Sequence, residues 1–122
     1  MNHNSKFLTI CQTAKQQIKE VDIEAAVALL ETDPDIILID VREESEWTHG
    51  HLPNAIHLSK GVIERDIEKV VPNPEQTLLL YCGGGFRSAL AAVNLQQMGY
   101  KKVISMDGGF RSWVEAGLPI ED

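Results

Sequence analysis

Short apolar runs alternate with helix-forming stretches along most of the chain, and this alternation constrains the fold more than any other feature. Residues 36–40, I-I-L-I-D, and residues 77–82, T-L-L-L-Y-C, are apolar at nearly every position. Such a run is typical of a strand inside a parallel sheet, because helices cover both of its faces. A-I-H-L at 55–58 and K-V-I-S-M at 102–106 follow the same pattern, and residues 18–21 add a short fifth strand.

Helical patterns fill the intervals between these strands. Asp22 is a suitable N-cap for the stretch D-I-E-A-A-V-A-L-L-E, which ends near a D-P pair. Three more helices are expected over residues 60–70, 87–98 and 110–116. We therefore predict an α/β fold, a mostly parallel five-stranded sheet with helices on both faces. Ligands of such sheets bind at the carboxyl ends of the strands.

The N-terminal segment differs from the rest of the chain. Residues 1–17 predict an amphipathic helix with lysines and no acid, and residues 18–122 predict the α/β domain. We expect this helix to pack on the domain; binding to a membrane surface is the alternative, against which its small apolar face argues. No apolar run approaches the about 20 residues that span a bilayer, and no signal-peptide pattern opens the chain. These features predict a soluble, cytoplasmic protein that binds no membrane.

Composition and charge limit the partners. The chain has 122 residues, of which 43% are hydrophobic and 24% charged, as in one globular domain. A net charge of −7 opposes the neutralisation of phosphates, so we expect no nucleic-acid partner. Between residues 76 and 114, however, four basic residues face one acid. That half of the chain could attract a small anion, although an ordinary solvated surface explains the pattern equally well.

The pentapeptide G-G-F-R-S occurs twice, at 84–88 and at 108–112, each time where a strand is followed by a helix. We interpret the repetition as shared turn chemistry, with glycines that permit a positive φ before a helix begins. Only the first copy follows a cysteine, Cys82, and a third glycine. The second copy follows Asp107, which is no nucleophile for such chemistry, so we interpret it as structural.

Cys82 is the candidate nucleophile. It ends an apolar strand, and the glycines after it let successive amides turn toward one anion at the start of the next helix. The thiolate is the reactive form of cysteine, and a helix N-terminus with a nearby arginine favours it. Arg87 can offer a forked guanidinium to an oxyanion. A buried structural role is the alternative for Cys82, and it is the preferred interpretation for Cys11, which lies on a helix face without a glycine loop.

Four ordered blocks carry a resemblance to a known family. They are L-I-D-V-R-E at 38–43, E-W-T-H-G-H-L-P-N-A at 46–55, C-G-G-G-F-R-S at 82–88 and M-D-G-G-F-R-S-W at 106–113. With them the chain resembles the single-domain rhodanese-like sulfurtransferases from about residue 18 to residue 119. The resemblance implies a parallel sheet flanked by helices, no cofactor, and a loop cysteine that accepts sulfane sulfur as a persulfide and passes it to a nucleophile.

The resemblance also implies roles for single residues. Cys82 would accept the sulfur, Arg87 would bind the anionic donor, and Asp40 with Arg42 would form a structural pair beside the site. A donor such as thiosulfate and a thiol or cyanide-like acceptor are the expected partners. His49 and His51 are a weak metal signal, because no third ligand is evident, so we expect no metal. The loop residues expected to hold the substrate are Gly83, Gly84, Gly85, Phe86, Arg87 and Ser88.

Three other functions remain as alternatives. A cysteine-dependent phosphatase or arsenate reductase uses a similar loop, but with one residue more between cysteine and arginine than the four found here. The shorter loop forms a tighter ring of amide groups, which suits a single sulfur atom better than a tetrahedral phosphate. Nucleotide binding is disfavoured, since the loop lacks the Gly-Lys-Ser/Thr ending of a P-loop. A rhodanese-like module that binds or delivers without turnover would usually lack the loop cysteine.

Overall fold

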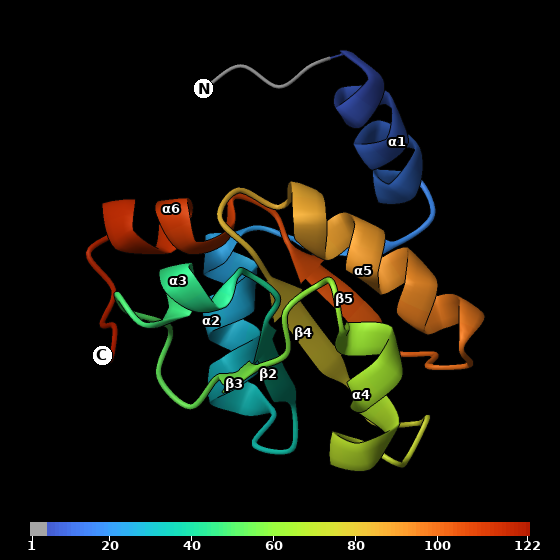
Figure 1. The fold of residues 1–122 in the computed structure, drawn as a ribbon. Coiled ribbons are helices and arrows are strands. Elements are labelled where there is room, and N and C mark those ends of the chain that lie inside the picture. Colours follow the sequence, from blue (N-terminus) through green and yellow to red (C-terminus); the bar gives the residue numbers. More distant parts are fainter. Residues whose placement is uncertain (1–4) are drawn as a thin grey trace.

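A five-stranded parallel sheet forms the centre of the protein (Figure 1). The computed structural model describes residues 5–122. Every neighbouring pair of strands is parallel, in the order β1-β5-β4-β2-β3, so the predicted α/β fold is confirmed. The strands are β1 (Lys19–Val21), β2 (Ile37–Asp40), β3 (Ile56–His57), β4 (Leu78–Tyr81) and β5 (Val103–Met106).

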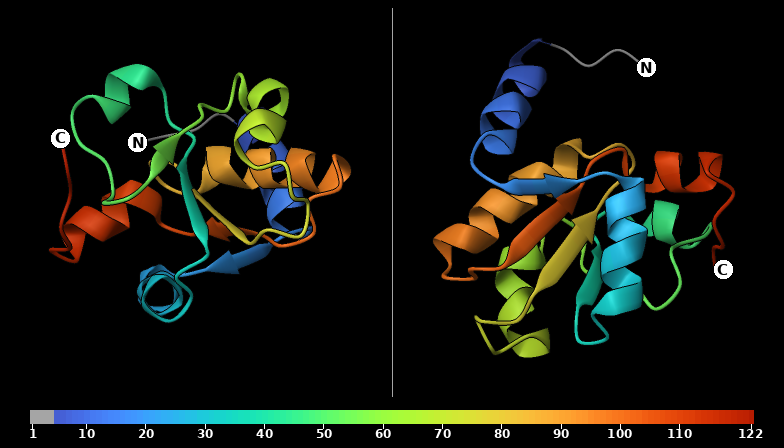
Figure 2. Two further views of the ribbon diagram at one scale, coloured as in Figure 1. Left: turned by 90° about the horizontal axis from the view of Figure 1, so that it is seen from below. Right: turned by 180° about the vertical axis from the view of Figure 1, so that it is seen from behind.

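Helices cover both faces of this sheet (Figure 2). α4 (Ile63–Val70) and α5 (Phe86–Gln97) pack on one face, and α2 (Ile23–Thr32) and α6 (Gly109–Glu115) on the other. The central strand β4 is buried at all four positions, which explains why its sequence is apolar without alternation. The predicted N-cap is also confirmed, because the Asp22 carboxylate accepts a hydrogen bond of 2.9 Å from the Ala25 amide.

α1 (Ser5–Lys15) forms an outer layer against α5 (Figure 1). Its buried residues are Cys11 and Ala14, and Lys15 joins it to the sheet through ion pairs to Glu20 at 2.7 Å and Asp107 at 3.2 Å. Residues 1–4 of the predicted N-terminal helix lie outside the described residues. Between residues 5 and 122, no helix is long and apolar enough to cross a bilayer.

A short helix that the sequence patterns did not predict is α3 (Glu44–Trp47). It begins with a capping box, in which the side chains of Glu43 and Glu46 bond each other's backbone amides. Four residues are too few to show helical periodicity, so only the acid spacing could have indicated it. α3 places Glu46 at the carboxyl edge of the sheet, beside the loop that follows β4.

Candidate active site

The loop after β4 directs amide groups at the sulfur of Cys82. Gly85 adopts a left-handed conformation, with φ 101°, and is the N-cap of α5. Its amide donates to Cys82 Sγ at 3.1 Å, and the Ser88 amide in the first turn of α5 donates at 3.3 Å. These first-turn amides have no partner within the helix, so they are free to bind a negative charge.

Behind the sulfur lies a buried pair of hydroxyl groups. Cys82 Sγ is 3.4 Å from Ser88 Oγ, which in turn lies 2.8 Å from Ser105 Oγ on β5. Both serines are fully buried. When the thiol is ionised, the Ser88 hydroxyl can donate to it while accepting from Ser105. Sequence reasoning missed Ser105, because a serine inside an apolar strand has no distinguishing pattern.

The sulfur lines a cavity of about 450 Å³ at the carboxyl edge of the sheet. Cys82 itself is only 1% exposed, so a substrate reaches it through this cavity. The walls come from elements far apart in sequence, and their residues other than Cys82 are Phe7 of α1, Glu46 of α3, Gly83, Gly84, Phe86 and Arg87 after β4, and Arg111 of α6. The volume lies within the range of pockets that hold small organic ligands.

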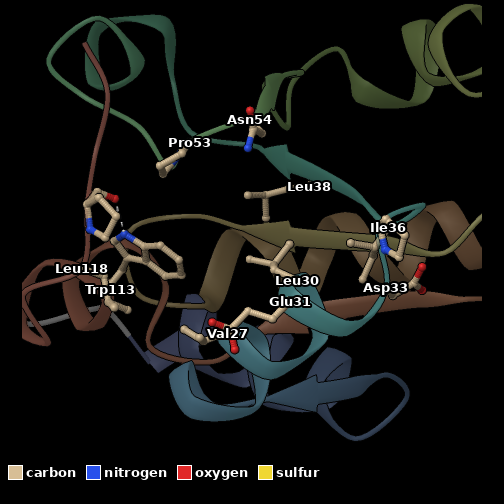
Figure 3. Close-up of a pocket in the computed structure, with 12 residues that line it drawn as sticks. Val27, Leu30, Glu31, Asp33, Ile36, Leu38, Pro53, Asn54, Trp113 and Leu118 are labelled. Carbon is tan, nitrogen blue, oxygen red and sulfur yellow. Dashed lines mark hydrogen bonds between the residues drawn. The ribbon is translucent and has the colours of Figure 1, made fainter.

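A second cavity, of about 390 Å³, lies between α2 and the C-terminal segment (Figure 3). Its walls include Val27, Leu30 and Leu38, and the Trp113 ring, whose Nε1 donates to the Pro119 carbonyl at 2.8 Å. No cysteine, histidine or basic residue lines it. Cys82, Arg87 and Arg111 line the other cavity.

The second G-G-F-R-S copy holds the first in place. The Phe110 amide donates to the Cys82 carbonyl at 2.8 Å, and the Arg111 amide donates to the Gly83 carbonyl at 3.0 Å. Gly109 lies so close to the first loop that an added Cβ would overlap the Cys82 carbonyl oxygen. The backbone of the second copy thus has the structural role that its sequence predicts, and its contact with the loop after Cys82 is a finding of the structure.

Arg87 is bound to Glu46 within the protein. Its guanidinium donates to the two carboxylate oxygens at 2.7 and 3.1 Å. These bonds lower the pKa of Glu46, although its partial burial opposes the shift. They also raise the pKa of Arg87, and the nearby Cys82 adds to that increase. Sequence reasoning missed Glu46, and the arginine predicted to bind an anion therefore already has an anionic partner.

Asp40, the last residue of β2, forms a buried ion pair with Arg42. The Arg42 guanidinium donates to both Asp40 oxygens, at 2.8 to 3.1 Å, and to the Gly50 carbonyl at 2.7 Å. Burial lowers the pKa of Arg42, but the bonds to Asp40 outweigh it and raise the pKa overall. Burial and the Asp40 charge raise the pKa of Tyr81, whose hydroxyl donates to Asp40 at 2.7 Å. The pair fixes the path of the chain from β2 to the turn at Gly50.

The remaining candidate residues form no hydrogen bond with the sulfur within residues 5–122. His49 bonds the Ser45 carbonyl, and His51 stacks on Trp47 with ring centroids 3.6 Å apart. Within the described part of the chain, no three metal-ligating side chains form a group. Cys11 is fully buried in the contact of α1 with the domain, and burial raises the pKa of its thiol. This favours the packing role over reactivity for Cys11.

Comparisons with known proteins identify the family. The rhodanese-like domain matches residues 22–116. A sulfurtransferase of Allochromatium vinosum is 31% identical over 84% of this chain and 94% of its own. The thiosulfate sulfurtransferase GlpE of Coxiella burnetii is 37% identical over 72% of this chain and 79% of its own. The putative sulfur carrier protein YrkF of Bacillus subtilis is 32% identical over 79% of this chain, which spans 51% of that protein.

Solved structures agree with this match. The polysulfide-sulfur transferase homodimer of Wolinella succinogenes has a TM-score of 0.82 and 33% identity, over 97% of this chain and 88% of its own. A protein of unknown function from Rhodopseudomonas palustris, described as a possible tyrosine phosphatase, has a TM-score of 0.85 and 31% identity, over 99% of this chain and 98% of its own. The match over residues 22–116 and these likenesses show that the chain belongs to the family of rhodanese-like domains.

Proposed function

We propose that this protein is a sulfurtransferase that carries sulfane sulfur from an anionic donor, such as thiosulfate, as a persulfide of Cys82. The observation that carries the proposal is the pair of amides, from Gly85 and Ser88, directed at Sγ at 3.1 and 3.3 Å. The names of the relatives, sulfurtransferase and thiosulfate sulfurtransferase, support the same class of reaction.

The reaction has two steps. The Cys82 thiolate attacks the outer sulfur of thiosulfate; a new S–S bond forms, the original S–S bond breaks, and sulfite leaves with the electron pair. An acceptor thiolate or cyanide then attacks the outer sulfur of the persulfide, and the Cys82 thiolate leaves. Charge balances in both steps, and neither requires an outside oxidant or reductant. The protein must therefore stabilise an anionic sulfur before, during and after the transfer.

The loop 83–88 suits that requirement. In the free protein, two amides and the Ser88 hydroxyl surround Sγ. In the persulfide the negative charge moves to the outer sulfur, and the cavity that Cys82 lines offers room for that atom. Preorganised amides stabilise such a charge without reorganisation at the moment of transfer. A persulfide thus replaces the thiolate without a change in the charge that the site holds.

A cysteine-dependent phosphatase is the second candidate, since the Rhodopseudomonas palustris relative is described as a possible tyrosine phosphatase. The loop here has four residues between Cys82 and Arg87. In addition, the Arg87 guanidinium that would bind a phosphate is bound to Glu46. Both features support sulfur transfer over phosphate-ester hydrolysis.

Intact-mass measurement after incubation with thiosulfate tests the proposal. We expect the protein to gain one sulfur atom, to lose it on addition of a thiol or cyanide, and to repeat this over many cycles. Cys82→Ser should abolish the gain, and Cys11→Ser should leave it unchanged. Loading that persists in Cys82→Ser would refute the proposal. A gain of sulfur without turnover would indicate a delivery module, and hydrolysis of an aryl phosphate would indicate the phosphatase.

A further inference from the structure

Arg111 is an uncompensated positive charge in the Cys82 cavity. It lines this cavity together with Cys82 and Arg87. The residue is exposed, and within residues 5–122 its guanidinium forms no hydrogen bond or ion pair. Lys15, the other basic residue near the loop, is held by Glu20 and Asp107.

Arg87 is less available to a substrate anion. Its guanidinium is bound on two nitrogens by the Glu46 carboxylate, and it lies against Gly83, where an added Cβ would be 3.1 Å from Nη2. The pair with Glu46 carries no net charge. An incoming anion must therefore compete with a carboxylate that is already in place, and it is repelled by that carboxylate at close range.

Arg111 is also well positioned for a role in binding. Its amide is fixed to the Gly83 carbonyl at 3.0 Å, so its Cα has a defined place relative to the reactive loop. Arg111 itself is exposed and lines the cavity, and its side chain is long enough to contact an anion bound there. The fork of N–H groups in a guanidinium matches the paired oxygens of sulfonate and carboxylate groups.

From these contacts we propose that Arg111, rather than Arg87, binds the anionic group of the substrate. Arg87 instead holds Glu46 and α3 against the loop. The inference rests on the proposed function only in that the sulfur donor is an anion. It predicts that Arg111 sets the preference of the site for negatively charged reagents over neutral ones.

Alkylation of Cys82 measures this preference without any sulfur transfer. Iodoacetate and iodoacetamide both form a thioether with the thiolate and release iodide, but only iodoacetate is an anion. Mass spectrometry gives the two alkylation rates of Cys82 in a Cys11→Ser background. The rate with iodoacetate divided by the rate with iodoacetamide is then divided by the same ratio for free glutathione. This normalised ratio reports the binding of a carboxylate beside Cys82. We expect this normalised ratio to be well above one.

Arg111→Ala should lower the ratio about tenfold, equivalent to about 1.4 kcal/mol. The rate with iodoacetamide should not change, because alanine keeps the amide that bonds Gly83. Arg111→Lys should restore part of the ratio, since lysine keeps the charge but lacks the fork. Lys102→Ala is the matched control, because it removes an exposed positive charge that does not line the cavity.

Three results would overturn the inference. The first is a normalised rate ratio in Arg111→Ala equal to that of the unsubstituted protein. The second is a fall of this ratio in Lys102→Ala as large as that in Arg111→Ala. The third is a reaction of Arg111→Ala that is slowed equally with iodoacetate and with iodoacetamide. With thiosulfate as donor, Arg111→Ala should raise KM about tenfold and leave kcat nearly unchanged. If the unsubstituted protein takes no sulfur from thiosulfate but the alkylation ratios behave as expected, the proposed function fails and the anion site remains.

Discussion

Gly109→Ala tests whether the second G-G-F-R-S copy holds the reactive loop. Gly109 has φ 52°, and a Cβ there would overlap the Cys82 carbonyl oxygen and lie 3.0 Å from the carbonyl carbon of Gly83. These are backbone atoms, which cannot rotate away as a side chain could. The methyl group must therefore separate α6 from the loop. That movement would break the hydrogen bonds from Phe110 and Arg111 to the first loop.

The expected loss of stability is the sum of two contributions. A left-handed conformation costs alanine about 1 kcal/mol relative to glycine. Loss of the two backbone hydrogen bonds, with net contributions of about 1 kcal/mol each, brings the total to about 3 kcal/mol. Gly117→Ala is the matched control, because Gly117 also has a positive φ, 73°, but no atom lies within 4 Å of its added Cβ. It should cost about 1 kcal/mol only.

Urea denaturation, monitored by Trp fluorescence, gives the free energy of unfolding of each of the two variants. Mass spectrometry under native conditions gives the rate at which each takes up sulfur from thiosulfate. Gly109→Ala should take up sulfur from thiosulfate at least tenfold more slowly. The reason is that a shift of the Cys82 carbonyl also moves the Cys82 side chain relative to the amides that bond its sulfur. Gly117→Ala should load at the normal rate. If the two variants are equally stable and load equally fast, the contact between the two loops does not matter for the site.

Two further predictions concern the ion pairs. Asp40→Asn leaves the Arg42 charge buried without a counter-ion, so we expect a loss of about 3–5 kcal/mol in urea denaturation, and a loss below about 1 kcal/mol would contradict the role of the pair. Glu46→Gln removes the partly exposed pair with Arg87, at a cost below about 1 kcal/mol near pH 7. Because the pKa of Glu46 is lowered in the fold from its usual 4.5, this contribution is fully present above pH 4.5 and is lost progressively as the pH falls through the lower pKa of the folded state. The difference between Glu46→Gln and the unsubstituted protein should therefore shrink as the pH falls below 4.5, and a difference that stays constant would be evidence against the pairing.

The sequence predicts the fold well because the strands are short, continuous apolar runs. β4, for example, is buried at every position, so its residues could only belong to the interior of a layered sheet. The same reasoning finds Cys82, because a strand end, three glycines and a helix start place amides around that one side chain. These features are local in the sequence, and local patterns are what such reasoning can use.

Other parts of the site depend on contacts between distant segments. Glu46 reaches Arg87 across 41 positions of the chain, and Ser105 reaches Ser88 across 17. Neither pairing has a local pattern, and each depends on which strands become neighbours in the sheet. The acid spacing of the capping box could have indicated α3, but it could not have indicated that Glu46 faces the loop.

The neighbouring positions of β4 and β5 explain how the two G-G-F-R-S copies come into contact. Because the two strands are parallel and adjacent, the turns that follow them meet at the same edge of the sheet. The α6 amides of Phe110 and Arg111 bond the carbonyls of Cys82 and Gly83, so they are not available to an anion. At the start of α5, the amides of Gly85 and Ser88 donate to Sγ instead. The first copy therefore directs amides at the sulfur of Cys82, whereas the backbone of the second copy holds the loop that contains Cys82.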